Sequence, residues 1–131
     1  MTENEIREMY DRYANALNTR RLDALDDLIG EEVALNGRPA ARATVVAAIR
    51  HNLDVVPDMH WELTDLLIDG DRLAVRAVNT GTPTQEWLGV PPSGGSFATA
   101  EMAIYRVRDG RFIEMSFVHD AADLKRQLHA A

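Results

Sequence analysis

The stretch SFATAEMAIYRVRDGRFIEMSFVHD, residues 96–120, decides the fold of this chain. Its two halves are rich in β-branched, aromatic and other apolar residues, a composition typical of strands. Between the halves lies Asp109-Gly110, a pair that two-residue hairpin turns favour. The stretch therefore predicts an antiparallel hairpin in which Arg108 pairs with Arg111.

The turn also predicts which residues share a face of this hairpin, because it sets the register and side chains alternate along a strand. One face mixes ionisable and apolar residues: Thr99, Glu101, Ala103, Tyr105, Glu114, Ser116, Val118 and Asp120. The other face is apolar: Ala100, Met102, Ile104, Ile113, Met115 and Phe117. The apolar face is expected to pack against helices or another subunit. Periodicity leaves open whether the mixed face lines a cavity or meets solvent.

Three helices are expected in the first half of the chain, before the main run of strands. Thr2 and Glu5 form a capping-box pattern, and apolar residues then recur at helical spacing as far as Leu17. A shorter apolar stripe over residues 22–29 predicts a second helix that ends at Gly30. After a brief strand over residues 32–35, apolar residues between 45 and 53 mark the third helix.

The second half of the chain predicts strands. HWELTDLLI (60–68) and RLAVRAVNTGTP (72–83) lie on either side of Asp69-Gly70, another pair that tight hairpins favour. A proline- and glycine-rich loop, WLGVPPSGG (87–95), precedes the last hairpin, and a helix over about residues 121–128 closes the chain. This order predicts an α+β domain with the helices on one side of a curved antiparallel sheet.

Composition narrows the classes of function. At 131 residues the chain is expected to form one domain, residues 1–131, and its net charge of −7 argues against nucleic-acid binding. There is no cysteine, and the four histidines lack metal-ligand spacing, so no metal site is expected. The N-terminus lacks signal-peptide features and no apolar run approaches the roughly 18 residues of a membrane span, so we expect a soluble cytoplasmic protein.

Several short motifs occur in an order known from one protein family. They are Gly70-Asp71, Gly81-Thr82, the loop from Gly89 to Gly94, Tyr105-Arg106, Asp109-Gly110-Arg111, Glu114, Asp120 and Gln127-Leu128. With these motifs the chain resembles the SnoaL-like polyketide cyclases, a family of the nuclear-transport-factor-2-like superfamily, over nearly its whole length. The resemblance implies a cone in which a curved antiparallel sheet wraps around N-terminal helices and encloses a deep pocket.

The resemblance also implies a catalytic base. In family cyclases an aspartate at the end of the last strand removes a proton alpha to a carbonyl, without a metal or cofactor. That position is Asp120 in this chain. Asp120 also precedes the expected closing helix, where an aspartate is a good N-cap. The residue is therefore expected to be a pocket base, a helix cap, or both.

The chain departs from the family pattern at the histidines. Ala103 stands at the position of the second catalytic histidine, and Pro83 replaces the histidine of a Gly-Thr-His motif. On the face of Ala103, Glu101 and Tyr105 are the groups expected to donate a hydrogen bond to an enolate, Glu101 only if it is protonated. Ion pairing and core packing are their structural alternatives. The expected substrate-binding residues are Trp61, Trp87, Ala103, Ser116 and Val118.

These observations favour a cofactor-independent cyclase or isomerase of secondary metabolism, acting on a hydrophobic polyketide-like substrate. The alternatives are a non-catalytic binding or dimerisation module of the same fold, and an enzyme like ketosteroid isomerases or epoxide hydrolases. The hydrolase alternative needs an arginine in the pocket, and Arg106 is expected to face away from Asp120. The family implies a homodimer or higher oligomer through the convex sheet face, for which the residues proposed are Met102, Ile104, Met115 and Phe117.

Overall fold

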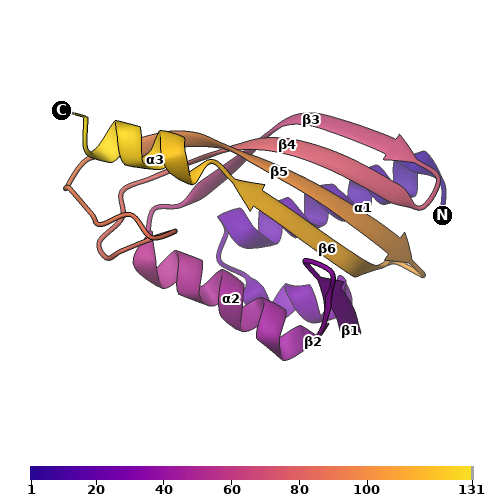
Figure 1. Cartoon of the computed structure of the whole chain (residues 1–131). Coiled ribbons are helices and arrows are strands. Elements are labelled where there is room, and N and C mark those ends of the chain that lie inside the picture. Colours follow the sequence, from indigo (N-terminus) through magenta and orange to yellow (C-terminus); the bar gives the residue numbers. More distant parts are fainter. Residues whose placement is uncertain (131) are drawn as a thin grey trace.

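The computed structural model describes residues 1–130 and confirms the expected α+β architecture (Figure 1). Its elements are α1 (Glu3–Asn18), the 3-10 helix η1 (Leu22–Asp27), β1 (Ile29–Leu35), β2 (Arg38–Ala41), α2 (Arg42–Val55), β3 (His60–Asp69), β4 (Arg72–Gly81), β5 (Phe97–Arg108), β6 (Arg111–His119) and α3 (Ala121–Leu128). The strands form one six-stranded sheet in the order β2-β1-β6-β5-β4-β3. The pair β1–β6 is parallel, and the other neighbours are antiparallel.

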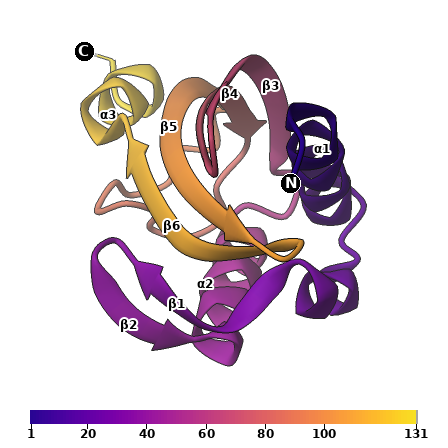
Figure 2. The same cartoon turned by 90° about the vertical axis from the view of Figure 1, so that its right-hand side faces the viewer.

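The sheet is curved, and the two longer N-terminal helices lie within its concave side (Figure 2). The α1 helix runs beside β3, whereas α2 packs near β1 and β2. The expected capping box begins α1: the Thr2 hydroxyl accepts from the Glu5 backbone at 3.1 Å, and the Glu5 carboxylate accepts from the Thr2 backbone at 2.8 Å. The apolar stripe of α1 is buried as its spacing predicts.

The second helix is shorter than its apolar stripe suggests, and Gly30 does not end it. Residues 22–27 form a single 3-10 segment, and Ile29 already belongs to β1. Pairing with β6 explains this, because Ile29 lies opposite Phe112 and the Phe112 backbone donates to the Leu28 carbonyl at 2.8 Å. A Cβ at Gly30 would lie 3.3 Å from the Phe112 carbonyl, so a side chain there would crowd the paired strand.

The β5–β6 hairpin has the predicted turn, but the predicted register is wrong beyond it. Arg108 pairs with Arg111, and both turn residues have positive φ, as a tight turn requires. After Val107 and Phe112 the register shifts by one residue, so that Arg106 lies opposite Glu114. The extra residue in this bulge is Ile113.

Burial explains the bulge. Phe112 and Met115 are both 0% exposed, although residues three apart on a regular strand point to opposite faces. One additional residue lets both side chains enter the core. As a consequence Met115, Phe117 and His119 share the concave side with the odd-numbered residues of β5. The first hairpin differs by one position as well, because Asp69 pairs with Arg72 and its two loop residues are Gly70 and Asp71.

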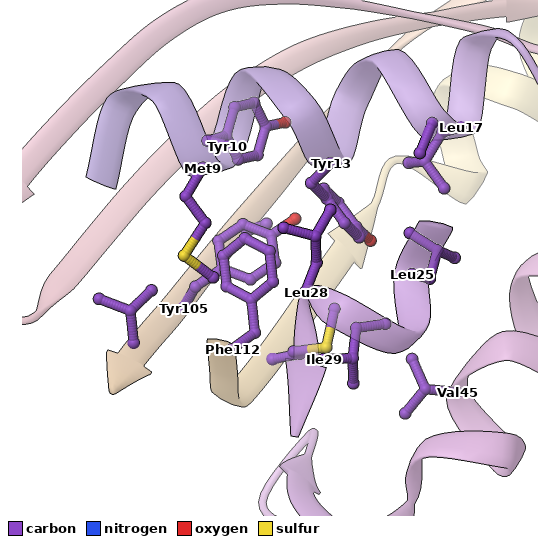
Figure 3. Packing of buried hydrophobic residues seen from close by; sticks show 14 of the residues in the cluster. Met9, Tyr10, Tyr13, Leu17, Leu25, Leu28, Ile29, Val45, Tyr105 and Phe112 are labelled. Carbon is purple, nitrogen blue, oxygen red and sulfur yellow. The ribbon is translucent and has the colours of Figure 1, made fainter. Parts of the chain in front are cut away.

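The core is centred on aromatic rings from α1 and the last hairpin (Figure 3). Tyr10 and Tyr13 of α1 lie 5.9 and 6.0 Å from the ring centroid of Tyr105, which in turn lies 4.8 Å from that of Phe112. A second cluster, at the opposite end of β5, packs the 82–96 loop against α3 and the end of α2: Val55, Val56, Met59, Trp87, Val90, Phe97, Leu124 and Leu128. Both clusters hold the helices against the sheet.

The convex side of the sheet is left uncovered. Leu67, Met102, Ile104 and Val118 project from it and are exposed. The expectation that Met115 and Phe117 belong to this face is wrong, because the bulge turns both toward the core. No helix formed by residues 1–130 has both the length and the apolar character needed to cross a membrane.

Candidate functional site

A pocket of about 140 Å³ opens on the concave side, between α1, α2 and the sheet. Its lining is largely aromatic and apolar, with a few polar groups from each surrounding element: Tyr10, Tyr13, Leu17, Leu35, Asn36, Val45, Ala48, Ile49, Asn52, Trp61, Glu101, Tyr105, Phe117 and His119. Such a combination of apolar walls and few polar groups is typical of small-molecule sites.

Glu101 is the ionisable group at the centre of this pocket. It is 6% exposed, and among residues 1–130 it is the one charged residue that is buried. Its Oε1 accepts a hydrogen bond from Asn79 Nδ2 at 2.9 Å and lies 3.5 Å from His119 Nδ1. The structure pairs it with no lysine or arginine in the described part of the chain. A buried carboxylate without a permanent cation is costly for stability, so its position points to function.

His119 is held by the same group of polar atoms. Its Nδ1 lies 3.5 Å from Asn79 Nδ2 as well as from Glu101. Because Asn79 Nδ2 is itself a donor to Glu101, a proton on His119 Nδ1 would be directed at the carboxylate, and Nε2 would be left as the acceptor. The edge of the His119 ring also meets Trp87, with centroids 5.6 Å apart. Asn79 is fully buried, and its Oδ1 has no hydrogen-bond partner among the described residues.

Three tyrosines supply hydroxyl groups to the pocket. Burial raises the pKa of Tyr10 and Tyr13 far above the usual range, and the negative charge of Glu101 raises both further. Burial raises the pKa of Tyr105 as well, with smaller contributions from Tyr13, Tyr10 and Glu101. All three phenols therefore stay protonated at neutral pH. Because the hydroxyls of Tyr105 and Tyr13 are hydrogen-bonded to each other, two of the three hydroxyls can donate to an oxygen in the pocket.

Asp120 lies outside this pocket. Its side chain is exposed and accepts from the Asp123 backbone at 2.9 Å, which makes it the N-cap of α3. Ser116 and Val118 lie on the convex side, where Val118 is 68% exposed. Their expected placement on the pocket face is wrong, because the bulge at Ile113 reverses the alternation of β6 relative to β5.

The remaining expected site residues divide between the pocket and the core. Trp61 lines the pocket together with Glu101 and Tyr105. Trp87 is buried beside the pocket, where it stacks on Phe97 at 5.0 Å and its Nε1 donates to Asn52 Oδ1 at 3.1 Å. Ala103 is buried in the main core and does not line the pocket. Sequence reasoning missed His119 and Asn79 as site residues.

A larger hollow on the convex side carries little chemistry. It has a volume of about 480 Å³ and is lined mainly by apolar side chains of β3–β6. The two ionisable residues that line it, Asp65 and Arg76, pair with each other at 2.6 Å. Arg106 is likewise occupied outside the inner pocket, by Asp71 and Glu114. The inner pocket is therefore the candidate active site, despite its smaller volume.

The described residues contain no group of three or more His, Cys, Asp or Glu side chains placed to hold a metal ion. The groups available for chemistry in the pocket are thus a carboxylate, an imidazole, amides and phenolic hydroxyls. These groups can move a proton and stabilise a negative charge on oxygen.

Comparisons with known proteins show the family and agree with the fold. The model of a family described as SnoaL-like polyketide cyclase matches residues 7–128. A SnoaL-like polyketide cyclase from Agrobacterium tumefaciens is 25% identical, with a TM-score of 0.88 over 93% of this chain and 96% of that one. TsrD from Streptomyces laurentii is 26% identical, with a TM-score of 0.89 over 100% and 99%. IdmH from Streptomyces antibioticus, a putative polyketide cyclase, is 28% identical, with a TM-score of 0.81 over 92% and 96%. The search of curated proteins finds no significant match.

Proposed function

Because the chain belongs to the SnoaL-like polyketide cyclase family, we propose that it is a cofactor-independent cyclase or isomerase with Glu101 and His119 as its acid–base pair. The observation that carries this proposal is the contact between the buried Glu101 carboxylate and His119 Nδ1, in a pocket whose other walls are mainly aromatic. The substrate is a hydrophobic carbonyl compound of the polyketide type. Members of the family and similar structures described as polyketide cyclases support this choice.

The reaction begins with proton abstraction. His119 Nε2 takes a proton from the carbon alpha to a substrate carbonyl. The electron pair of that C–H bond forms the C=C bond of the enolate, and the π pair of the carbonyl moves to its oxygen. Glu101 balances the charge of the resulting imidazolium through Nδ1. The tyrosine hydroxyls donate hydrogen bonds to the enolate oxygen, where negative charge develops.

The second half of the reaction decides between ring closure and isomerisation. In a cyclase the enolate carbon attacks another carbonyl of the same molecule, and the imidazolium returns its proton to the new alkoxide. In an isomerase the proton returns to a different carbon. Both outcomes use the same pair of groups, and the aromatic walls exclude water from the enolate.

Replacement of single groups tests this assignment. We expect Glu101→Gln and His119→Asn each to slow deuterium exchange at the alpha carbon of acetophenone by about 10²- to 10⁴-fold, the usual contribution of general acid–base catalysis. Exchange is followed by proton NMR in D₂O. The matched control is Asp120→Asn, which retains a cap of similar quality and is expected to leave the rate within about twofold.

The same experiment distinguishes the two carboxylates. A large loss of exchange in Asp120→Asn, with little change in Glu101→Gln, would transfer the role of base to Asp120. Equal rates in all variants and in buffer would instead favour a non-catalytic binding protein. Circular dichroism of each variant establishes that it is folded before its rate is compared.

We also propose that two copies associate through the convex face. The exposed side chains of Leu67, Met102, Ile104 and Val118 form an apolar patch over β3, β5 and β6. Soluble monomers seldom leave apolar patches of several strands uncovered, and burial in an interface removes that surface from water. The pocket opens on the opposite side of the sheet, so association leaves its entrance accessible.

A further inference from the structure

The inner pocket is smaller than the usual pocket for a drug-sized ligand. Its volume is about 140 Å³, whereas pockets for drug-sized ligands span roughly 300–1,000 Å³. A closed apolar cavity of about 150 Å³ holds one benzene molecule. The space beside Glu101 and His119 therefore matches a single six-membered ring.

The walls that limit this space are closely packed. The Tyr105 ring lies 5.7 Å from Phe117 and 6.0 Å from Tyr13 between ring centroids, so the strand side and the α1 side support each other. Tyr13 also rests on Phe112, at 5.0 Å. Cores at this density resist the insertion of extra atoms, and overpacking typically costs about 1–3 kcal/mol. A fused ring system would have to displace several of these rings at once.

The charges of the lining restrict the ligand further. None of the described residues that line the pocket is a lysine or arginine, and its one carboxylate is Glu101. A carboxylate or phosphate on the enclosed part of a ligand would lie near that negative charge without a cation to offset it. A neutral carbonyl oxygen, in contrast, can accept hydrogen bonds from the tyrosine hydroxyls.

We propose that the part of the substrate enclosed during the reaction is a single uncharged ring bearing the reacting carbonyl. That this carbonyl reacts rests on the proposed function, whereas the limits on the size and charge of the enclosed ring concern binding alone. Any further ring or tether of the substrate lies at the mouth of the pocket, beside Asn36 and Ala48, which are the exposed residues of its lining. The substrate class is accordingly a neutral aryl or cyclic ketone, not a carbonyl placed within a multi-ring system.

Binding of matched ketones tests the size limit. Acetophenone carries its carbonyl on one ring, whereas 9-acetylanthracene carries it on the middle of three. Burial of apolar area alone would make the larger compound bind more tightly. We expect the opposite order, with acetophenone at least tenfold tighter by calorimetric titration of protein into ligand. Equal or tighter binding of 9-acetylanthracene, or no binding of acetophenone, would overturn the proposal.

The charge limit is tested with an isosteric pair. We expect 3-acetylbenzamide to bind at least tenfold more tightly than 3-acetylbenzoate at neutral pH. Tighter or equal binding of the benzoate would show that the pocket accepts an anion and would contradict the proposal.

Two neighbouring residues provide the matched variants. Phe117→Ala removes a pocket wall and is expected to improve binding of 9-acetylanthracene at least fivefold relative to acetophenone. Val118→Ala, whose side chain lies on the convex face, should leave the ratio unchanged. Thermal unfolding of each variant confirms that it is folded. The binding and exchange experiments can fail separately. If the ketones bind in the expected order but neither Glu101→Gln nor His119→Asn alters deuterium exchange, the substrate class stands and the acid–base assignment fails.

Discussion

The two faces of the β5–β6 hairpin differ in kind although their residues alternate along the same strands. The concave face brings Glu101, Tyr105 and His119 to a pocket closed by helices, whereas the convex face exposes Met102 and Val118. Composition alone does not separate them, since both contain apolar side chains. What separates them is the cover that α1 and α2 provide, and the bulge that decides which side of β6 lies under it.

The side chains that the bulge turns inward carry the largest expected effect on stability. Met115 and Phe117 contact the core, whereas Ser116 and Val118 lie on the convex side. Combined replacement of Met115 and Phe117 by alanine removes two large core side chains and predicts a fall in the free energy of unfolding of about 5 kcal/mol or more, measured by urea denaturation. The matched control, combined replacement of Ser116 and Val118 by alanine, is expected to cost less than about 1 kcal/mol. Similar losses in the two double variants would refute this role of the bulge.

Alkaline pH probes the concave face alone, because all three tyrosines of the chain line its pocket. Their pKa values are raised by burial in the folded state, whereas unfolded tyrosines ionise near pH 10. Their contribution to stability is therefore intact below pH 10 and declines above it, by about 4 kcal/mol at pH 11. Tyrosinate absorbance should appear only together with the loss of circular dichroism. Tyrosinate formation in folded protein would contradict this expectation.

A charged residue introduced on the convex face tests the proposed dimer interface and leaves the pocket residues unchanged. In the proposed dimer, Val118→Asp would place an unpaired carboxylate in each half of the interface and raise the dimer dissociation constant by about tenfold or more. Analytical ultracentrifugation measures this change. Leu88→Asp, at an exposed leucine of the 82–96 loop, is the control. A monomeric wild-type protein, or a dimer indifferent to Val118→Asp, would exclude this interface.

The smallest expected effect is on stability, and it concerns Asp120, the N-cap of α3, which belongs to neither the pocket nor the apolar patch. Its replacement by alanine should lower the free energy of unfolding by about 1 kcal/mol, and its replacement by asparagine should change it very little. Thermal denaturation with both variants measures the difference. Equally small losses in both variants would show that the cap is not needed. The α3 helix would then be held by Leu124 and Leu128, which are buried against the 82–96 loop, and by the Gln127 side chain, which hydrogen-bonds both backbone groups of Ala98.

Much of the fold could be predicted because its signals are local. The capping box, the turn at Asp109-Gly110 and the closing helix over residues 121–128 each depend on residues close together in the chain, and the structure contains all three. Glu101, Tyr105 and Trp61 were also predicted to lie together, and they line the pocket. Their catalytic and binding roles remain predictions.

The bulge could not be predicted because its cause is tertiary. Two residues three apart are buried together only once α1 supplies the tyrosines against which Phe112 packs. No local pattern around Ile113 indicates that requirement. A prediction from sequence therefore continues the regular alternation of side chains past Ile113, where the structure interrupts it. The error placed Asp120 in the pocket and left out His119, its neighbour in the chain.

The parallel pairing of β1 with β6 has a consequence for how the chain is made. β1 begins at Ile29, but the strand beside it ends only at His119, and the Asn36 side chain accepts from the Phe117 backbone across 81 residues of sequence. As the chain emerges from the ribosome, at roughly 5–20 residues per second, β1 and β2 must wait several seconds for their partner. The edge of the sheet that is synthesised first is thus completed last, and the nascent protein carries a β1–β2 pair with one unpaired edge until β6 arrives.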